Sequence, residues 1–153
     1  MRARDIMDTR FHTLRPQQSV ADAVKLFRTA SEQEGKKIFG LMVTDAQERL
    51  VGMLSMYDIL LFIRPKHAAL WGEIEDLRRE EVFDELLDRV KAIRVEDIMT
   101  AEVVTIGPDT HAMVIADLMI SRHIRRLPVV EGREVVGIVY ISDLFYHLLQ
   151  KFM

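Results

Sequence analysis

Apolar and polar positions follow the same order twice along the chain. In each half, a short apolar strand before a proline is followed by a helix with apolar residues on one face. Two apolar runs joined by a short polar connector then predict a β-hairpin, and a second amphipathic helix closes the half. The predicted strands cover 11–14, 38–44 and 50–54 in the first half and 103–106, 127–130 and 135–140 in the second. Each half is therefore predicted to fold in the order strand, helix, strand, strand, helix.

Identical residues at constant spacings indicate that the two halves are copies of one unit. Asp5-Ile6-Met7 recurs 92 positions later as Asp97-Ile98-Met99. Near the end of each copy, Asp58 matches Asp143 at a spacing of 85. The first copy therefore carries 7 extra residues between its first helix and its last glycine. Such internal repetition predicts a tandem of two small structural units.

The segment 65–94 belongs to neither copy. Its apolar residues recur every three to four positions, which predicts one or two amphipathic helices. Glu75 and Arg79 have the spacing of a helical ion pair. The helix could pack along its apolar stripe, or Trp71 could begin a docking face for a partner protein. The predicted organisation is a first repeat at 1–64, a helical insert at 65–94 and a second repeat at 95–153, in an α+β (α/β) architecture.

Composition narrows the class of protein. The 153 residues are 49% hydrophobic and 29% charged, which is typical of a soluble globular protein. The net charge of −3 disfavours nucleic-acid binding, and the absence of cysteine excludes disulfides and thiolate chemistry. The longest clean apolar run, 59–63, is too short to span a membrane, and residues 1–5 lead into no signal-like segment. We therefore expect a cytoplasmic protein.

Several motifs resemble those of CBS domains, the family named after cystathionine β-synthase. The resemblance rests on the segments 51–58, 126–130, 136–139 and 142–144 and on the two Asp-Ile-Met sequences. It implies a pseudo-twofold pair of repeats, a Bateman module, with two clefts between the copies. It also implies dimerisation of such pairs into a flat disc. The implied ligands are adenosine compounds (AMP, ADP, ATP or S-adenosylmethionine), with no required cofactor, and the implied role is to regulate a partner protein.

The family's ligand motif places a hydroxyl residue and an aspartate where the last strand meets the last helix. A helix N-terminus suits a phosphate, and an ionised aspartate can accept hydrogen bonds from two ribose hydroxyls. The first copy matches the whole motif over 52–58. In the second copy, 137–143, Tyr140 replaces the hydroxyl residue and could stack on a base or fill the cleft.

The resemblance implies that each cleft joins the motif of one copy to the opening strand of the other. The first cleft would contain Ser55, Asp58, Thr100, Val104 and Thr105. The second would contain Ile138, Tyr140, Ser142, Asp143, Thr9, His12 and Thr13. Arg125 and Arg126 precede the second hairpin, where the family often has phosphate-binding residues. The corresponding segment of the first copy has Ile38 and Phe39, preceded by Lys36 and Lys37. From these positions we expect the Asp143 cleft to be the better anion site.

Each of these residues also has an ordinary structural interpretation. Ser55 with Asp58, and Ser142 with Asp143, could cap helices, as Ser19 with Asp22 is predicted to do. Arg125 and Arg126 could form surface ion pairs, and strand alternation would let only one of them enter a cleft. The histidines lack the spacing of metal ligands, so no metal site is expected.

The sequence is compatible with three classes of function. The leading hypothesis is a stand-alone nucleotide sensor that signals to a partner protein. The alternative is an interaction or oligomerisation module with occluded clefts. Catalysis is the weakest hypothesis, because the sequence contains no nucleophile elbow, Walker loop, dinucleotide fingerprint or zinc-protease motif.

Overall fold

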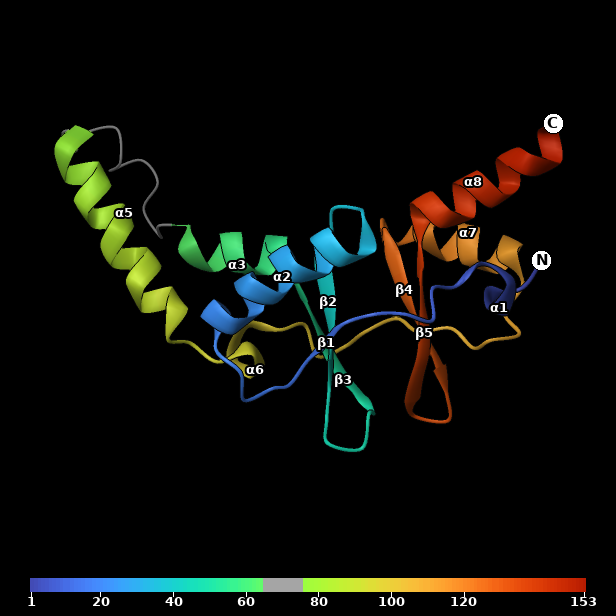
Figure 1. Ribbon diagram of the computed structural model, residues 1–153, viewed down its shortest axis with the longest axis horizontal. Helices are drawn as coiled ribbons and strands as arrows, with labels where there is room; N and C mark the ends of the chain where they lie inside the picture. The colour runs from blue at the N-terminus through green and yellow to red at the C-terminus, as the bar shows by residue number, and fades with distance from the viewer. Residues whose placement is uncertain (65–75) are drawn as a thin grey trace.

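The computed structural model describes residues 1–64 and 76–153 (Figure 1). Two predictions therefore involve residues outside the described ranges. These are the docking face that begins at Trp71 and the ion pair between Glu75 and Arg79, since Trp71 and Glu75 are not described. The first repeat contains α1 (Ala3–Ile6), β1 (Thr13–Leu14), α2 (Val20–Glu34), β2 (Gly40–Thr44), β3 (Leu50–Ser55) and α3 (Met56–Ile63). Helix α5 (Asp76–Lys91) follows, and then α6 (Val95–Ile98), α7 (Ala112–Ser121), β4 (Arg126–Glu131), β5 (Glu134–Tyr140) and α8 (Ile141–Phe152).

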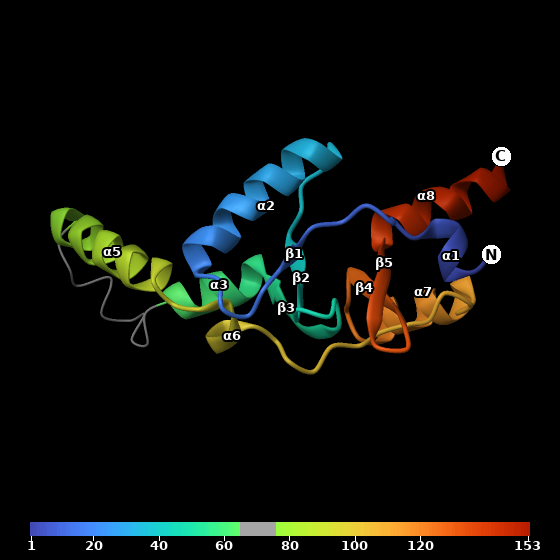
Figure 2. The same cartoon turned by 60° about the horizontal axis from the view of Figure 1, so that its bottom comes forward.

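Each repeat is built around the predicted hairpin. Strand β2 pairs antiparallel with β3 and parallel with β1, whereas β4 pairs antiparallel with β5. The two hairpins lie side by side, and α5 projects from the end of the molecule nearer the first repeat (Figures 1 and 2). The prediction of mixed helices and strands in two similar units is confirmed.

The opening strands are shorter than predicted. In the second repeat only Ile106 pairs, in a parallel bridge with Val129, although the prediction covered 103–106. Continuing this ladder would require an N–H group at Pro128 to bond the carbonyl of Val104, and proline has none. In the first repeat the strand begins at Thr13 rather than at Phe11. The shorter strands leave the preceding segments free to approach the other repeat.

The helix N-caps are as predicted in the first repeat, but the cap of the last helix in the second repeat differs from the prediction. Reciprocal capping boxes join Ser19 to Asp22 and Ser55 to Asp58. Helix α8, however, begins at Ile141, so its N-cap is Tyr140, which makes no side-chain cap hydrogen bond. The alternative interpretation, that Ser142 caps this helix, is therefore contradicted, because Ser142 already lies within the first turn.

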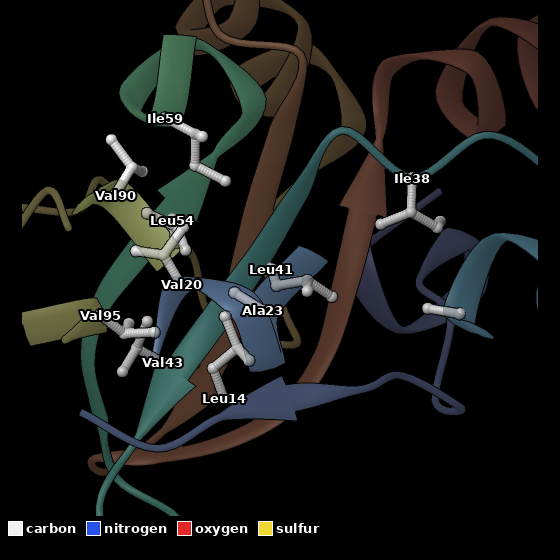
Figure 3. Close-up of a cluster of buried hydrophobic side chains, with 11 residues drawn as sticks. Leu14, Val20, Ala23, Ile38, Leu41, Val43, Leu54, Ile59, Val90 and Val95 are labelled. Atoms are coloured by element: carbon white, nitrogen blue, oxygen red, sulfur yellow. The ribbon is translucent and has the colours of Figure 1, made fainter. Parts of the chain in front are cut away.

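The opening helix of each repeat packs into the hydrophobic core of the other repeat. The first core contains Leu14, Leu41 and Leu54 from the first repeat, together with Val95 from α6 of the second repeat (Figure 3). The second core contains Ile115, Leu127 and Val139, together with Ala3 and Ile6 from α1 of the first repeat. Each opening segment therefore crosses to the other repeat, which brings residues of both repeats to the same clefts.

Candidate functional site

Two equivalent backbone contacts place the opening segment of each repeat against the last strand of the other. The N–H of Met53 donates to the carbonyl of Thr100 (2.9 Å), and the N–H of Ile138 donates to the carbonyl of Asp8 (3.0 Å). Gly52 and Gly137 permit this approach, because a Cβ atom on either would overlap a methionine side chain of the facing segment. The two contacts lie at equivalent positions in the two repeats, and Met53, Thr100 and Asp8 line the cavities described below.

The Asp58 cleft is a cavity of about 770 Å³ between the two repeats. Four residues expected in this cleft line it, namely Ser55, Asp58, Thr100 and Val104. Thr105, also expected there, is exposed and lies outside the lining. The sequence reasoning missed Phe39, Met53, Tyr57 and Glu102, which complete the apolar and polar walls.

Asp58 divides its two carboxylate oxygens between capping and the cleft. The N–H of Ser55 donates to Oδ2 (2.9 Å), while the N–H of Asp58 donates to Oγ of Ser55 (3.1 Å). The other oxygen, Oδ1, lies 3.5 Å from the hydroxyl of Thr100. The structural interpretation of Ser55 and Asp58 is thus confirmed, and it leaves one carboxylate oxygen available to the cavity.

Arg125 and Arg126 line the Asp58 cleft, so the prediction that they serve the Asp143 cleft is wrong. The side chain of Arg126 lies over Gly40 of the first repeat. Burial lowers the pKa of Arg126, and the neighbouring Arg125 lowers it further against the opposing effect of Asp58. Both arginines reach one cleft because Arg125 precedes β4, where strand alternation does not apply.

Arg122 lines the same cleft and, with Arg125 and Arg126, forms a basic wall. Arg122 and the neighbouring His123 were not predicted as site residues. They follow α7, and His123 adopts a left-handed backbone conformation with φ 54°. Both side chains are exposed and line the Asp58 cleft. In the described part of the chain, neither Arg122 nor Arg125 forms an ion pair. The available signal was the sequence itself, which places four basic residues within 122–126.

The Asp143 cleft has a different character. Its cavity, of about 820 Å³, is lined by residues of the first repeat, namely the expected Thr9 and His12 and, among those missed, Asp8, Gln33 and Glu34. The motif residues Tyr140 and Asp143 lie outside this lining and adjoin it through Lys36. His12 Nε2 lies 2.8 Å from Oε1 of Gln33, and Nδ1 lies 3.4 Å from Oε2 of Glu34. Both partners belong to the last turn of α2. That helix has 15 residues, whereas its counterpart α7 has 10, so part of the extra length of the first repeat covers this cleft.

Lys36 occupies the carboxylate side of the Asp143 cleft. Its Nζ donates to Oδ2 of Asp8 (2.6 Å), lies 3.5 Å from Oδ2 of Asp143 and sits 4.1 Å from the ring centroid of Tyr140. Burial opposes the charge on Lys36, but its hydrogen bond to Asp8 and the charge of Asp143 outweigh burial and raise its pKa. Burial and the charge of Asp8 raise the pKa of Asp143, and burial also raises the pKa of Tyr140.

Six other predicted site residues lie outside the linings of the two cavities, and two of them, Tyr140 and Asp143, contact Lys36. Thr13 pairs with Met42 in the sheet, and Ile138 is buried in β5. Ser142 is exposed in the first turn of α8. Lys37 lines a separate apolar groove between α2 and α3.

Two other kinds of feature, clusters of metal-ligating side chains and membrane-spanning helices, are not found in the described residues. Within residues 1–64 and 76–153, no three His, Asp or Glu side chains group as metal ligands. Across the same ranges, no helix has the length and apolarity to cross a bilayer.

The sequence matches the CBS domain family over residues 3–65 and 95–150, which correspond to the two structural repeats. The chain belongs to the CBS domain family. The CBS pair is similar to the Methanocaldococcus jannaschii protein MJ1426, with 30% identity over 141 residues that cover 84% of this chain and 80% of that protein. It is also similar to the chloroplastic CBS domain-containing protein CBSX2 of Arabidopsis thaliana, with 28% identity over 91% of this chain and 59% of that protein.

Solved structures confirm the fold of the CBS pair. A crystal structure of CBSX2 in complex with AMP has a TM-score of 0.73 and 26% identity, and the match covers 99% of this chain and 98% of that one. A CBS domain-containing protein from Kribbella flavida has a TM-score of 0.74 at 19% identity, covering 97% and 99%. The chain also matches inosine-5'-monophosphate dehydrogenase of M. jannaschii, but over only 20% of that enzyme. That match therefore carries no evidence of catalysis.

Proposed function

We propose that this CBS pair binds one adenine nucleotide in the Asp58 cleft and thereby regulates a partner protein. The observation that carries the proposal is the basic wall of Arg122, Arg125 and Arg126, which faces Asp58 across one cavity. Arginine guanidinium groups bind phosphate through paired N–H donors. The crystal structure of CBSX2 with AMP supports the ligand class.

Each part of a nucleotide finds a suitable group in this cleft. Asp58 Oδ1 can accept hydrogen bonds from ribose hydroxyls, because only Oδ2 is used in the capping box. The basic wall can bind the phosphates of AMP, ADP or ATP. Phe39, Met53 and Tyr57 offer apolar and aromatic surface to the base. The ligand would contact both repeats, since Asp58 belongs to the first and the arginines to the second.

Contacts to both repeats supply a route for regulation. A ligand shifts a conformational equilibrium only if it binds the two conformations with different affinities. A nucleotide that bridges Asp58 and Arg126 favours the arrangement in which these residues face the same cavity. A partner protein that recognises this arrangement would respond to nucleotide concentration, in keeping with a regulatory protein rather than an enzyme.

Isothermal titration calorimetry with AMP and ATP tests the proposal. We expect saturable binding by the wild-type chain and at least a tenfold loss in Asp58→Asn and in Arg126→Ala. Asp58→Asn also weakens a capping box, so Asp22→Asn is the matched control, because it weakens the equivalent box on α2 away from the cleft. Binding of neither nucleotide, or equal losses in the control, would reject the proposal.

A second candidate is an interaction module that needs no ligand. The observation in its favour is the Asp143 cleft, where Lys36 already contacts the motif aspartate. Exposed apolar residues on α8, including Phe145, Tyr146 and Phe152, also offer a surface for a second copy of the chain. We propose a homodimer through this surface, and the two candidates differ in whether nucleotide changes the assembly.

A further inference from the structure

We propose that Lys36 is a built-in occupant of the Asp143 cleft and limits the CBS pair to one nucleotide per chain. The inference rests on the proposed function of the Asp58 cleft and adds its stoichiometry and the residue that determines it. It is argued from the different surroundings of the two motif aspartates.

The hairpin registers identify the equivalent of Lys36 in the second repeat. Gly40 pairs with Ser55, and Arg126 pairs with Tyr140. Ser55 and Tyr140 are equivalent N-caps, so Gly40 and Arg126 are equivalent positions. Lys36 precedes Gly40 by four residues, just as Arg122 precedes Arg126 by four. A cation therefore stands four residues before the hairpin at each cleft, in the loop after α2 in the first repeat and at the C-cap of α7 in the second.

The two cations differ in their partners. Arg122 is exposed at the Asp58 cleft, and in the described part of the chain it has no acidic partner. Lys36 is about two-thirds buried, with a side-chain exposure of 32%, and contacts Asp8, Asp143 and the face of Tyr140. One position thus offers a free charge to a ligand, while the other has its charge neutralised within the protein.

The motif aspartates differ in the same way. In Asp58, Oδ1 faces the cleft, where its protein neighbour is the Thr100 hydroxyl at 3.5 Å. In Asp143, Oδ2 is buried, accepts no hydrogen bond from the described residues and faces the ammonium of Lys36 at 3.5 Å. A ribose hydroxyl that approached this oxygen would have to displace Lys36 and break its 2.6 Å hydrogen bond to Asp8.

The net charge around the Asp143 cleft also disfavours a phosphate. Asp8, Glu34 and Asp143 outnumber Lys36 and Arg10 among the charged groups of the cavity and its motif. The Asp58 cleft has the opposite balance, with three arginines against Asp58 and Glu102. A nucleotide therefore prefers the Asp58 cleft both by charge and by access to the motif aspartate.

Titration with adenosine tests the role of Lys36 because adenosine carries the ribose hydroxyls without the phosphate charge. We expect the wild-type chain to bind one adenosine and Lys36→Ala to bind two. The second site should disappear in the double variant Lys36→Ala/Asp143→Asn. Lys37→Ala is the matched control, since Lys37 is the adjacent lysine and lies outside both cavities, and it should bind one adenosine.

Lys36→Ala leaves Asp8 and Asp143 without their shared cation, so its folding is checked by thermal unfolding. If it does not fold, Asp8→Asn/Lys36→Ala removes one of the two carboxylates that lose their cation and gives the same readout. If the folded Lys36 variant binds one adenosine, or the wild type binds two, the role proposed for Lys36 is wrong, while the proposed function of the Asp58 cleft is unaffected. No adenosine bound by any variant would likewise overturn the inference. A wild-type site lost in Asp143→Asn but retained in Asp58→Asn, or no binding of AMP to the wild type, would overturn the proposed function as well.

Discussion

Arg126 of the second repeat lies over Gly40 of the first, in space that a Cβ atom at position 40 would occupy. The glycine therefore does more than pair with Ser55 at the start of the hairpin. It allows a basic side chain to cross between the repeats and reach the Asp58 cleft.

Gly40→Ala is expected to weaken nucleotide binding more than it weakens the fold. The new methyl group would displace the side chain of Arg126, which is flexible enough to move at small cost in stability. We expect the dissociation constant for AMP to rise about tenfold, or about 1.4 kcal/mol, with little change in melting temperature. Gly107→Ala is the control, because a Cβ atom there meets nothing closer than 3.9 Å. Equal AMP affinity in the two variants would contradict the role assigned to Gly40.

The two serines of the ligand motifs are expected to differ in their effect on stability. Ser55→Ala removes the oxygen that caps α3, at a cost of about 1 kcal/mol in the free energy of unfolding. Ser142→Ala removes an exposed hydroxyl within α8, and we expect a change within about 0.5 kcal/mol. Urea unfolding measures both, and equal losses would show that Ser142 has a capping role after all.

Asp143 is expected to make the fold less stable as pH rises from acid towards neutral. Its pKa is raised in the folded protein, chiefly by burial and then by the charge of Asp8. The folded protein therefore holds this proton more tightly than the unfolded chain. The resulting stabilisation is fully present below the ordinary pKa of 3.8 and is lost as pH rises through the raised value.

Asp143→Asn removes this titration, so we expect the variant to gain stability relative to the wild type between about pH 4 and pH 7. The measurement is the melting temperature of both proteins across this range. Asp45→Asn is a useful contrast, because backbone hydrogen bonds from Arg49 and Gln47 and the charge of Arg49 lower the pKa of Asp45 despite an opposing contribution from burial. A relative loss in Asp143→Asn with rising pH would show that Lys36 outweighs burial.

Removal of two arginines from the basic wall is expected to reduce both the affinity for ATP and the dependence of that affinity on salt. Arg122→Ala/Arg125→Ala leaves Asp58 and Arg126 in place but removes two exposed charges from the cleft. We expect at least a tenfold loss of ATP affinity at low salt and a smaller difference from the wild type at high salt, where screening is stronger. An unchanged affinity for ATP at low salt would place its phosphates elsewhere.

A charge in the exposed apolar surface of α8 is expected to separate the proposed dimer. Phe145 is 56% exposed and contacts Tyr146 edge-to-face. We expect the wild-type chain to have about twice its 17.8 kDa mass in solution and Phe145→Arg to have the mass of one chain. Glu131→Arg at the exposed end of β4 is the control. Light scattering after size-exclusion chromatography measures the masses, and a monomeric wild type would reject the dimer.

The elements that local sequence patterns determine were predicted well. The hairpins follow from apolar runs with short polar connectors, and the capping boxes at Ser19 and Ser55 follow from a three-residue spacing. The cleft of Arg126 was predicted wrongly because it depends on the side chain crossing to Gly40, a contact between residues 86 positions apart. The role of Lys36 was missed for the same reason, since its partners Asp8 and Asp143 lie in different repeats.

The exchange of opening helices between the two cores affects how the chain can fold. A fragment containing the first repeat alone would lack Val95, and one containing the second alone would lack Ala3 and Ile6, although these residues are buried in the cores. Each fragment would expose apolar surface that the intact chain covers. The duplicated unit is therefore not an autonomous folding unit, and we expect both repeats to unfold in a single cooperative transition.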